Sequence, residues 1–464
     1  MNTTYAAIQG QVLQVMSGDT LIILLDGKDP LVPSSQRRVN LASVRAPKLG
    51  NLKKNVADEA WAQEAKEKLI HLAIGKKVKI VVEYERTSLV GTEEQTFTYC
   101  TVELMNGMNL AEELVSAGLV SVVRHRDDEA RASNYDQLLL AENQAKQARV
   151  GLFNQKKPSI RHRVDFSETP AKAKTNLHFL KQKSRYHGFI EYVFSASHYL
   201  VHIPEENCQF SFNLQGVKAP LSSSRGKGES FGDESLMYAK LHFLQRDVTV
   251  EIVNVDKGGS FIGDLYMGNK KESIGLELLR EGVVFINETS IDFCRQAELM
   301  EEAEETAKIV GLSAVKYGDL SNQASKDYIF DVERFTSSEG NTGPYILYTI
   351  VRIKSILRKY EESGKKAGEG KIGAGRSDSE KALQLELSKF NSVMETAFEE
   401  CAPHKICAYI YDLANAFNKF YHETKILGSE DEAAKKSWIA LLLLTRKVLE
   451  TCIDLLGFEA PEKM

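Results

Sequence analysis

The sequence has no long run of hydrophobic residues. Its longest candidate, Trp438–Thr445, is about half of the roughly 18 residues that a membrane-spanning helix requires. The first residues, MNTTYAAIQG, also lack the basic and then apolar layout of a secretory signal. We therefore expect a cytoplasmic protein that does not associate with a membrane.

Paired cysteines are also missing. The chain has 6 cysteines, and none of them forms a CxxC pair or lies near histidines at the spacing of a zinc site. In a cytosolic protein such cysteines are reduced and mostly buried. The cysteines therefore indicate no zinc site, and we expect no other metal site and no bound cofactor.

The chain lacks a strong excess of charge of either sign. Its 59 Lys and Arg against 64 Asp and Glu give a net charge of −5, which provides no global attraction to nucleic acid. Any contact with RNA must then come from local basic patches. With 464 residues and 43% hydrophobic content, the chain is expected to fold into about three domains.

What the sequence does contain is an internal duplication. The stretch Asn40–Pro47 (NLASVRAP) returns as Asn213–Pro220 (NLQGVKAP). Two more pairs follow in the same order: Glu113-Leu114 with Gly118 against Glu277-Leu278 with Gly282, and Gly151-Leu152 against Gly311-Leu312. Three landmarks in one order indicate two homologous domains.

Each copy combines short strands with helices. Alternating apolar residues predict strands within 9–25 and 77–84 of the first copy, whereas apolar residues at helical spacing predict a helix over 58–73. Long terminal helices are expected at 134–148 and 292–310. Five short strands with helices are typical of an oligonucleotide-binding barrel, so the first two thirds are expected to be α+β.

Several motifs stand out in these copies. The first copy carries Ser17-Gly18-Asp19-Thr20, Asn109–Leu114 (NLAEEL) and Val123–Asp128 (VRHRDD), and His162–Asp165 (HRVD) follows it. The second copy carries Glu191–Ser195 (EYVFS) and Asp256–Gly263 (DKGGSFIG). These motifs resemble the third and fourth staphylococcal-nuclease-like repeats of the Tudor staphylococcal-nuclease family. The resemblance implies domains at 1–155 and 185–300, with a linker at 156–184.

The nuclease mechanism, as this resemblance implies it, needs two aspartates on calcium, a glutamate that activates water and two arginines on the phosphate. In the first copy the first aspartate is Asp19, but the second falls on Arg45 and the glutamate on Lys48. The arginine positions fall on Asn40 and near Thr98. One ligand does not make a metal site, so we expect no cleavage by this mechanism.

The second copy departs further from the nuclease pattern. Its aspartate positions fall on Ser197 and Lys218, its base on Leu221 and its arginines on Asn213 and Ser260. A cation in place of an acidic ligand, as at Arg45 and Lys218, repels calcium and attracts phosphate. The old cleft is thus a candidate anion groove; the alternative is a solvated surface on a scaffold.

Further basic residues lie near that cleft. In the first copy the set is Arg37, Arg38, Arg45, Lys48, Lys53 and Lys54, and the linker adds Lys156, Lys157, Arg161, His162 and Arg163. Aromatic side chains that could stack on bases are Tyr84, Phe97, Tyr99, Tyr192 and Tyr199, although most of them are also explained as core residues of strands.

The last third of the sequence loses the strand pattern and becomes helical, so an all-α bundle is expected over 300–464. Helices are expected at 381–400 and 404–421. The stretch 361–380 is rich in glycine among charges, which predicts a flexible loop.

This helical part has its own motifs: Tyr317–Gln323 (YGDLSNQ), Tyr328–Asp331 (YIFD), Glu339–Tyr345 (EGNTGPY), Tyr411–Ala414 (YDLA), Phe417–Tyr421 (FNKFY) and Pro461–Met464 (PEKM). They resemble the anticodon-binding domain of bacterial arginyl-tRNA synthetase. In that family the bundle grips the anticodon stem and loop of tRNA. The binding residues that the resemblance implies here are Asn341, Tyr345, Tyr348, Arg352 and Met464, while the alternative places both tyrosines in the core.

The sequence has no signatures resembling the HIGH and KMSKS motifs of a synthetase, so we expect no activation of arginine.

The two resemblances meet within a predicted helix at 297–308, which fits a natural fusion, an engineered chimera or an assembly error. The favoured interpretation is an RNA-binding protein that takes tRNA through 300–464, with proteins as further partners of the nuclease-like domains. The alternatives are a calcium-dependent nuclease of the Tudor type, a partial arginyl-tRNA synthetase and a protein-interaction scaffold in RNA silencing or transcription.

Overall fold

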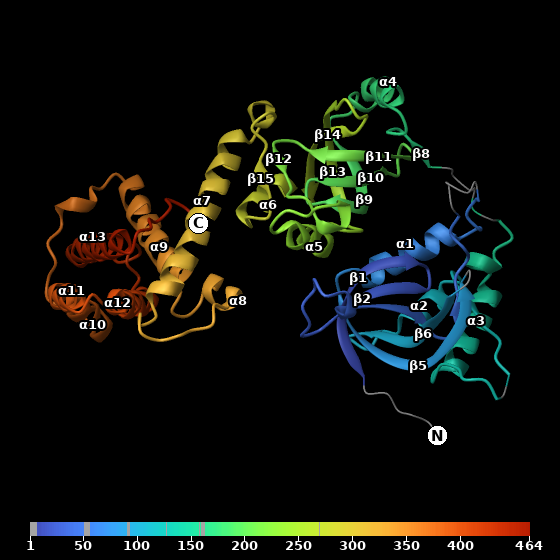
Figure 1. The fold of residues 1–464 in the computed structure, drawn as a ribbon, viewed down its shortest axis with the longest axis horizontal. Coiled ribbons are helices and arrows are strands. Elements are labelled where there is room, and N and C mark those ends of the chain that lie inside the picture. The colour runs from blue at the N-terminus through green and yellow to red at the C-terminus, as the bar shows by residue number, and fades with distance from the viewer. Residues whose placement is uncertain are drawn as a thin grey trace. The chain divides into compact units, whose positions relative to one another are not determined.

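The computed structural model describes residues 7–50, 56–90, 93–126, 128–156, 158, 163–268 and 270–464. The chain divides into two compact units, Met1–Ala297 and Glu298–Met464 (Figure 1). The first unit is rich in strands and the second is helical, which confirms the predicted fold class. Among the described helices, none is both long and apolar enough to cross a membrane.

The first unit begins with a closed five-stranded barrel. Its strands follow one another around the barrel in the order β1, β2, β3, β6, β5. Only β3 and β6 pair in parallel. The elements are β1 (Ile8–Ser17), β2 (Thr20–Leu25), β3 (Gln36–Leu41), β4 (Val44–Arg45), α1 (Ala62–Ala73), β5 (Lys77–Val90), β6 (Glu93–Leu104), α2 (Leu110–Ser116), β7 (Ser121–Val122) and α3 (Tyr135–Ala148).

Helix α1 packs against this barrel through its small and apolar residues. Ala65, Leu69 and Ala73 are fully buried, and they recur at helical spacing, which places them on one face of α1. Gly75 ends the helix at φ +69°, a left-handed conformation that glycine adopts without strain. A side chain at this position would also collide with Arg246 of the following barrel.

A second barrel follows in the same unit. Strands β9, β13, β14 and β11 pair in succession, and a β10–β11 pairing together with β10–β9 closes the ring. Along β11 the burial alternates, with Cys208, Phe210, Phe212 and Leu214 inside, as expected for a barrel wall. The elements are β8 (Val164–Asp165), α4 (Pro170–Leu180), β9 (Tyr186–Ser195), β10 (His198–Ile203), β11 (Cys208–Leu214), β12 (Val217–Lys218), α5 (Gly232–Phe243), β13 (Asp247–Val255), β14 (Phe261–Met267), α6 (Ile274–Arg280) and β15 (Phe285–Ile286).

The second unit is a helical bundle whose central helices α9, α12 and α13 share one apolar core. The side chains of Ile350, Leu413, Phe417 and Leu442 are fully buried there. The elements are α7 (Ala297–Leu320), α8 (Val332–Thr336), α9 (Gly343–Glu362), α10 (Asp378–Ser388), α11 (Phe390–Glu399), α12 (Pro403–Glu423) and α13 (Glu432–Leu455).

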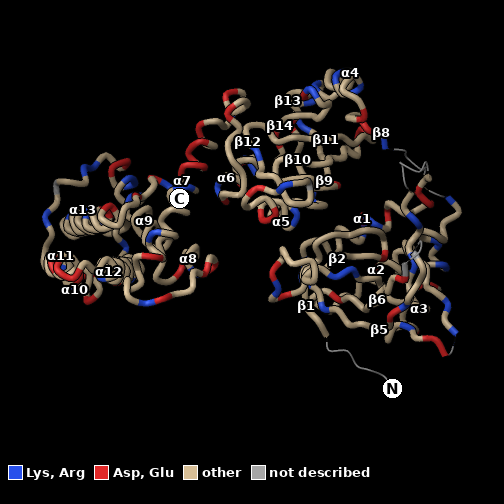
Figure 2. Tube along the Cα trace, viewed as in Figure 1, with Lys and Arg blue, Asp and Glu red and all other residues tan. Residues whose placement is uncertain are grey.

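Two predicted helices differ from the observed ones. The helix expected at 292–310 begins at Ala297, because Ile291–Phe293 forms a separate 3-10 turn, and it continues to Leu320. Its first half is strongly acidic (Figure 2). The helix expected at 381–400 is interrupted at Lys389, whose N–H donates to the carbonyl of Glu386 and so breaks the regular pattern of the helix.

The glycine-rich stretch at 361–380 lies on α13. The Gly373 N–H donates to Ser437 Oγ at 2.8 Å, and Arg376 and Lys365 pair with Asp431 and Glu432. These contacts fix the stretch at several points, and its flexibility stays a prediction.

Candidate nucleic-acid interfaces

The turn that carries Asp19 is tied together by the carboxylate itself. Asp19 Oδ1 accepts from Ser17 Oγ at 2.6 Å and from Thr20 Oγ1 at 3.2 Å, and Oδ2 accepts from the Ala46 N–H at 2.8 Å. Both oxygens are therefore engaged, and they tie the turn between β1 and β2 to the residue that follows β4. Among the described residues, no group of three or more His, Cys, Asp or Glu could hold a metal ion.

The second barrel makes the same link with a neutral side chain. Ser197 Oγ accepts from the Ala219 N–H at 3.1 Å, which is the counterpart of the Asp19 contact with Ala46. The two copies thus share the structural bond of the turn, while only the first keeps a carboxylate there.

Three of the cations predicted at the former cleft, Arg45, Lys48 and Lys218, are exposed. Arg45 lies on β4, which pairs with β7, and Lys218 lies on β12, which pairs with β15. Arg45, Lys48 and Lys218 are all exposed, and within the described ranges none of them forms an ion pair with a carboxylate. Their charge is therefore available to a phosphate.

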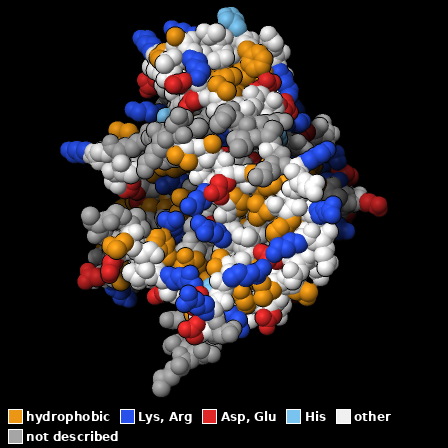
Figure 3. Space-filling view, turned by 90° about the vertical axis from the view of Figure 1, so that its right-hand side faces the viewer, with side chains coloured by type: hydrophobic (Ala, Val, Ile, Leu, Met, Phe, Trp, Pro, Cys, Tyr) orange, Lys and Arg blue, Asp and Glu red, His pale blue; other side chains and the backbone are white. Residues whose placement is uncertain are grey.

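Arg37 and Arg38 point to opposite faces of β3, because successive residues of a strand alternate in direction. Arg38 lies over the Phe97 ring at 5.9 Å, whereas Arg37 lies 4.0 Å from Glu85. Figure 3 shows one face of the molecule, on which Lys and Arg side chains are interspersed with apolar ones. The predicted Lys53, Lys54, Lys157, Arg161 and His162 lie outside the described residues.

The candidate stacking residues divide between core and surface. Tyr199 and Tyr84 are buried, and the Tyr84 hydroxyl accepts from the Ser43 N–H at 3.0 Å. Tyr192 is exposed, and Arg86 lies over the rings of Tyr84 and Tyr99. Tyr199 and Tyr84 therefore serve the barrel, while Tyr192 remains accessible to a base.

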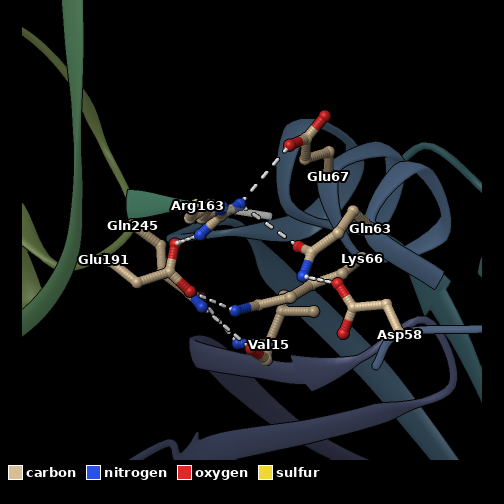
Figure 4. Close-up of polar contacts among 8 residues, drawn as sticks. All are labelled: Val15, Asp58, Gln63, Lys66, Glu67, Arg163, Glu191 and Gln245. Atoms are coloured by element: carbon tan, nitrogen blue, oxygen red, sulfur yellow. Dashed lines mark hydrogen bonds and ion pairs between the residues drawn. The ribbon is translucent and has the colours of Figure 1, made fainter. Parts of the chain in front are cut away.

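A polar contact between the two barrels was not foreseen from the sequence (Figure 4). Lys66 of α1 reaches Glu191 of β9, with Nζ 2.5 Å from Oε1, and Arg163 Nη1 lies 3.2 Å from the other oxygen. Burial alone raises the pKa of Glu191, but Lys66 and Arg163 outweigh it and lower that pKa below its ordinary value. Arg163 also donates to Gln63 Oε1 at 3.2 Å. Arg163, the residue directly before β8, therefore contacts both barrels.

In the helical unit, an aromatic and polar cluster lies on α9 and α12. Arg352 lies over the Tyr348 ring at 4.6 Å and the Tyr421 ring at 5.2 Å. Its guanidinium donates to Asn418 Oδ1 at 2.6 Å and to the Tyr348 hydroxyl at 2.9 Å. Tyr345 joins through its hydroxyl, which donates to Asn415 Oδ1 at 2.7 Å and accepts from Asn418 Nδ2 at 2.9 Å.

Three of the five residues predicted in this unit thus meet in one cluster: Tyr345, Tyr348 and Arg352. Asn341 instead accepts from the Tyr317 hydroxyl at 2.6 Å, and Met464 is exposed, with no described contact to the cluster. Asn415 and Asn418 also belong to the cluster and were not predicted from the sequence. Their spacing with Tyr411 along α12 places all three on one helical face and could have identified them.

Comparison with known proteins gives two families. Residues 38–155 and 211–313 match the staphylococcal nuclease homologue family, and residues 346–464 match the DALR anticodon binding domain. Both resemblances predicted from the sequence are confirmed.

The individual relatives also belong to two groups, arginine–tRNA ligases and ribonucleases named TUDOR. An arginine–tRNA ligase of Agathobacter rectalis is 66% identical over 169 residues, covering 35% of this chain and 28% of the ligase. Ribonuclease TUDOR 2 of Arabidopsis thaliana is 33% identical over 322 residues, covering 64% of this chain and 32% of the relative. Ribonuclease TUDOR 1 of the same plant is 29% identical over 401 residues, covering 79% of this chain and 38% of the relative. The chain spans only about a third of the length of these relatives.

Proposed function

Because the chain combines two staphylococcal nuclease homologue segments with a DALR anticodon binding domain, we propose that it is an RNA-binding protein. It takes tRNA through residues 300–464 and cleaves RNA with neither nuclease-like barrel. The proposed division is 1–155 and 185–300 for the barrels, with the linker 156–184 between them. A cytoplasmic location belongs to the same proposal and rests on the unpaired cysteines. Protein partners of the barrels and a role in RNA silencing rest on the resemblance.

The observation that carries this proposal is the exposed cluster on α9 and α12. The Tyr348 side chain is 44% exposed beside the guanidinium of Arg352. Aromatic rings and guanidinium planes stack on unpaired bases, and the exposed Asn415 amide offers hydrogen bonds to base edges, while Asn418 holds Arg352 and Tyr345 in place. An anticodon loop presents such bases.

The barrels support the binding part of the proposal through exposed cations. Arg45, Lys48 and Lys218 stand where a calcium-dependent nuclease needs carboxylates, and Asp19 is engaged by three donors. Calcium needs several oxygen ligands, and phosphoryl transfer needs a base and added positive charge. The three cations are therefore suited to binding a phosphate group, and they do not supply the calcium ligands or the base that cleavage requires.

The test is tRNA binding by the full chain, measured from about 50 to about 200 mM salt. The affinity should fall steeply with salt, and Arg352→Ala should weaken it by about 5- to 150-fold, as expected for a lost base-stacking contact. Arg358→Ala is the matched control, because Arg358 lies on the same helix and stacks on no ring in the described chain. A folded chain that binds no tRNA at low salt would contradict the proposal and favour the protein-interaction scaffold.

A calcium-dependent ribonuclease is the second candidate, favoured by the surviving Asp19 and by the relatives named as ribonucleases. Cleavage of single- and double-stranded RNA should be assayed with calcium and with a chelator. Cleavage that the chelator blocks and that Asp19→Ala abolishes would establish this candidate.

A further inference from the structure

The second barrel presents an aromatic ring directly beside an unpaired cation. In the short antiparallel ladder of β12 and β15, Lys218 is the register partner of Phe285, and Val217 is the partner of Ile286. Val217 is buried, whereas Lys218 is exposed and Phe285 is 55% exposed. The Lys218 and Phe285 pair therefore faces outward, and its side chains lie within about 5 Å of each other at their Cβ atoms.

The backbone around this pair is held in place. The Asn287 N–H donates to the Gly216 carbonyl at 2.8 Å, and the Gly216 N–H donates to Ser290 Oγ at 3.2 Å. These bonds extend the ladder on the side of Gly216. The ring and the ammonium are thus presented by a fixed scaffold, which lowers the entropy cost of binding a ligand there.

The first barrel has the same ladder without the ring. Arg45 is the register partner of Ser121 there, and the buried pair Val44 and Val122 faces inward. Both copies therefore display a cation at this position, and only the second adds an aromatic platform. The difference lies in the side chains and not in the fold.

Further exposed apolar side chains belong to the segments that adjoin this ladder. Leu221 follows Lys218 closely in the chain and is 50% exposed, and Phe231 at the start of α5 is 72% exposed. Ser235 Oγ of α5 donates to the Val283 carbonyl at 2.6 Å, which ties α5 to the residues before β15. The nearby carboxylates of Glu229 and Asp233 accept hydrogen bonds from this segment, from the Leu221 N–H and from Ser222 and Ser223.

We propose that Phe285 and Lys218 form a binding site for an unpaired RNA nucleotide, an inference that rests on the proposed RNA-binding function. The base stacks on the Phe285 ring, and the neighbouring phosphate pairs with the Lys218 ammonium. Every base has a π-face, so this contact is tolerant of sequence, and it requires an unstacked base, so it selects single strands over duplex. An apolar protein surface would use the Phe285 ring and would leave the Lys218 ammonium without a partner.

The test compares a short single-stranded RNA with a blunt RNA duplex of the same length, both bound to the full chain. Phe285→Ala should weaken single-strand binding by about 5- to 150-fold and leave duplex binding unchanged. Phe285→Trp should keep the affinity, because a ring remains. Lys218→Ala should weaken the binding of single-stranded RNA. It should also reduce the magnitude of the slope of log affinity against log salt by about 1, because one phosphate contact is lost.

Two controls match these variants. Ser121→Ala changes the equivalent position of the first barrel without removing a ring, and Phe398→Ala removes a ring that is 85% exposed in the helical unit. Unchanged thermal unfolding of each variant shows that the fold is intact. The inference is overturned if Phe285→Ala binds single strands as the unchanged chain does while tRNA binding remains sensitive to Arg352→Ala, a result that leaves the proposed function standing. If the chain without substitutions binds no RNA at all, the proposed function is overturned instead.

Discussion

The side-chain amide of Gln245 pairs with both polar groups of the Val15 backbone: Oε1 accepts from the N–H, and Nε2 donates to the carbonyl, each at 2.8 Å. Strand β1 pairs with β5 only over Ile8–Gln11, so one edge of β1 is open at Val15. A glutamine of the second barrel occupies that edge as a strand would. The contact satisfies buried backbone groups that would otherwise lack a partner.

Gln245→Ala should therefore lower the free energy of unfolding of the first unit by about 1 to 3 kcal/mol, because it leaves buried polar groups unsatisfied. Amide hydrogen exchange at Val15 should also become faster, since its N–H loses its acceptor. Gln137→Ala, at an exposed position of α3, is the control and should change neither quantity. Unaltered exchange at Val15 in Gln245→Ala would show that the two barrels do not depend on this contact.

His202 should make stability depend on pH. Burial and the charge of Arg163 lower the pKa of His202 from 6.5 to about 4. Between those values the unfolded chain binds a proton that the folded chain does not, so stability rises with pH across this window and is lost as pH falls from about 6.5 to about 4. The loss attributable to His202 is on the order of 3 kcal/mol. Chemical unfolding of His202→Gln over this range should show a flatter pH profile, and a profile parallel to that of the unchanged chain would contradict the assignment.

Asp19 and Ser197 should contribute unequally to the stability of their barrels. Asp19→Ala removes a charged acceptor from three donors, for a cost of about 1.5 to 3 kcal/mol, whereas Ser197→Ala removes a neutral acceptor, for about 0.5 to 1.5 kcal/mol. Denaturant titrations of the two variants measure the difference. Equal effects would mean that the Asp19 carboxylate has little structural role.

Two substitutions of Tyr348 should show whether its ring or its hydroxyl contributes to tRNA binding by the helical unit. Tyr348→Phe keeps the ring under Arg352 and loses only the bond from Arg352 Nη2, so tRNA affinity should change little. Tyr348→Ala removes the ring and should weaken binding by about 5- to 150-fold. Fluorescence anisotropy with labelled tRNA measures both, and equal losses in the two variants would argue that the hydroxyl, not the ring, meets the RNA.

The sequence predicted those features that depend on local patterns. The strands expected within 9–25 and 77–84 and the helix expected at 404–421 follow from the positions of apolar residues alone, and they are present as β1, β2, β5 and α12. The bundle and the two barrels follow from motifs that are contiguous in the chain. Tyr345, Tyr348 and Arg352 were expected only because the helical part resembles an anticodon-binding domain, and their positions on α9 bring them together.

Features that join distant segments were not predictable in this way. Gln245 and Val15 are remote in sequence, and nothing in a single glutamine indicates that it will complete the edge of a strand in another barrel. The outward position of Phe285 depends on the register of a two-residue ladder. Ladder register and barrel contacts are set by tertiary packing, which local propensity does not encode.

The central claim is that the chain binds tRNA without cutting it. The most direct measurement is a gel that resolves both protein complexes and fragments, run on labelled tRNA incubated with the full chain and calcium, with and without chelator. We expect a shifted band of intact tRNA that is the same in both lanes and weaker for Arg352→Ala. Fragments that appear only without chelator, or no shifted band at low salt, would contradict it.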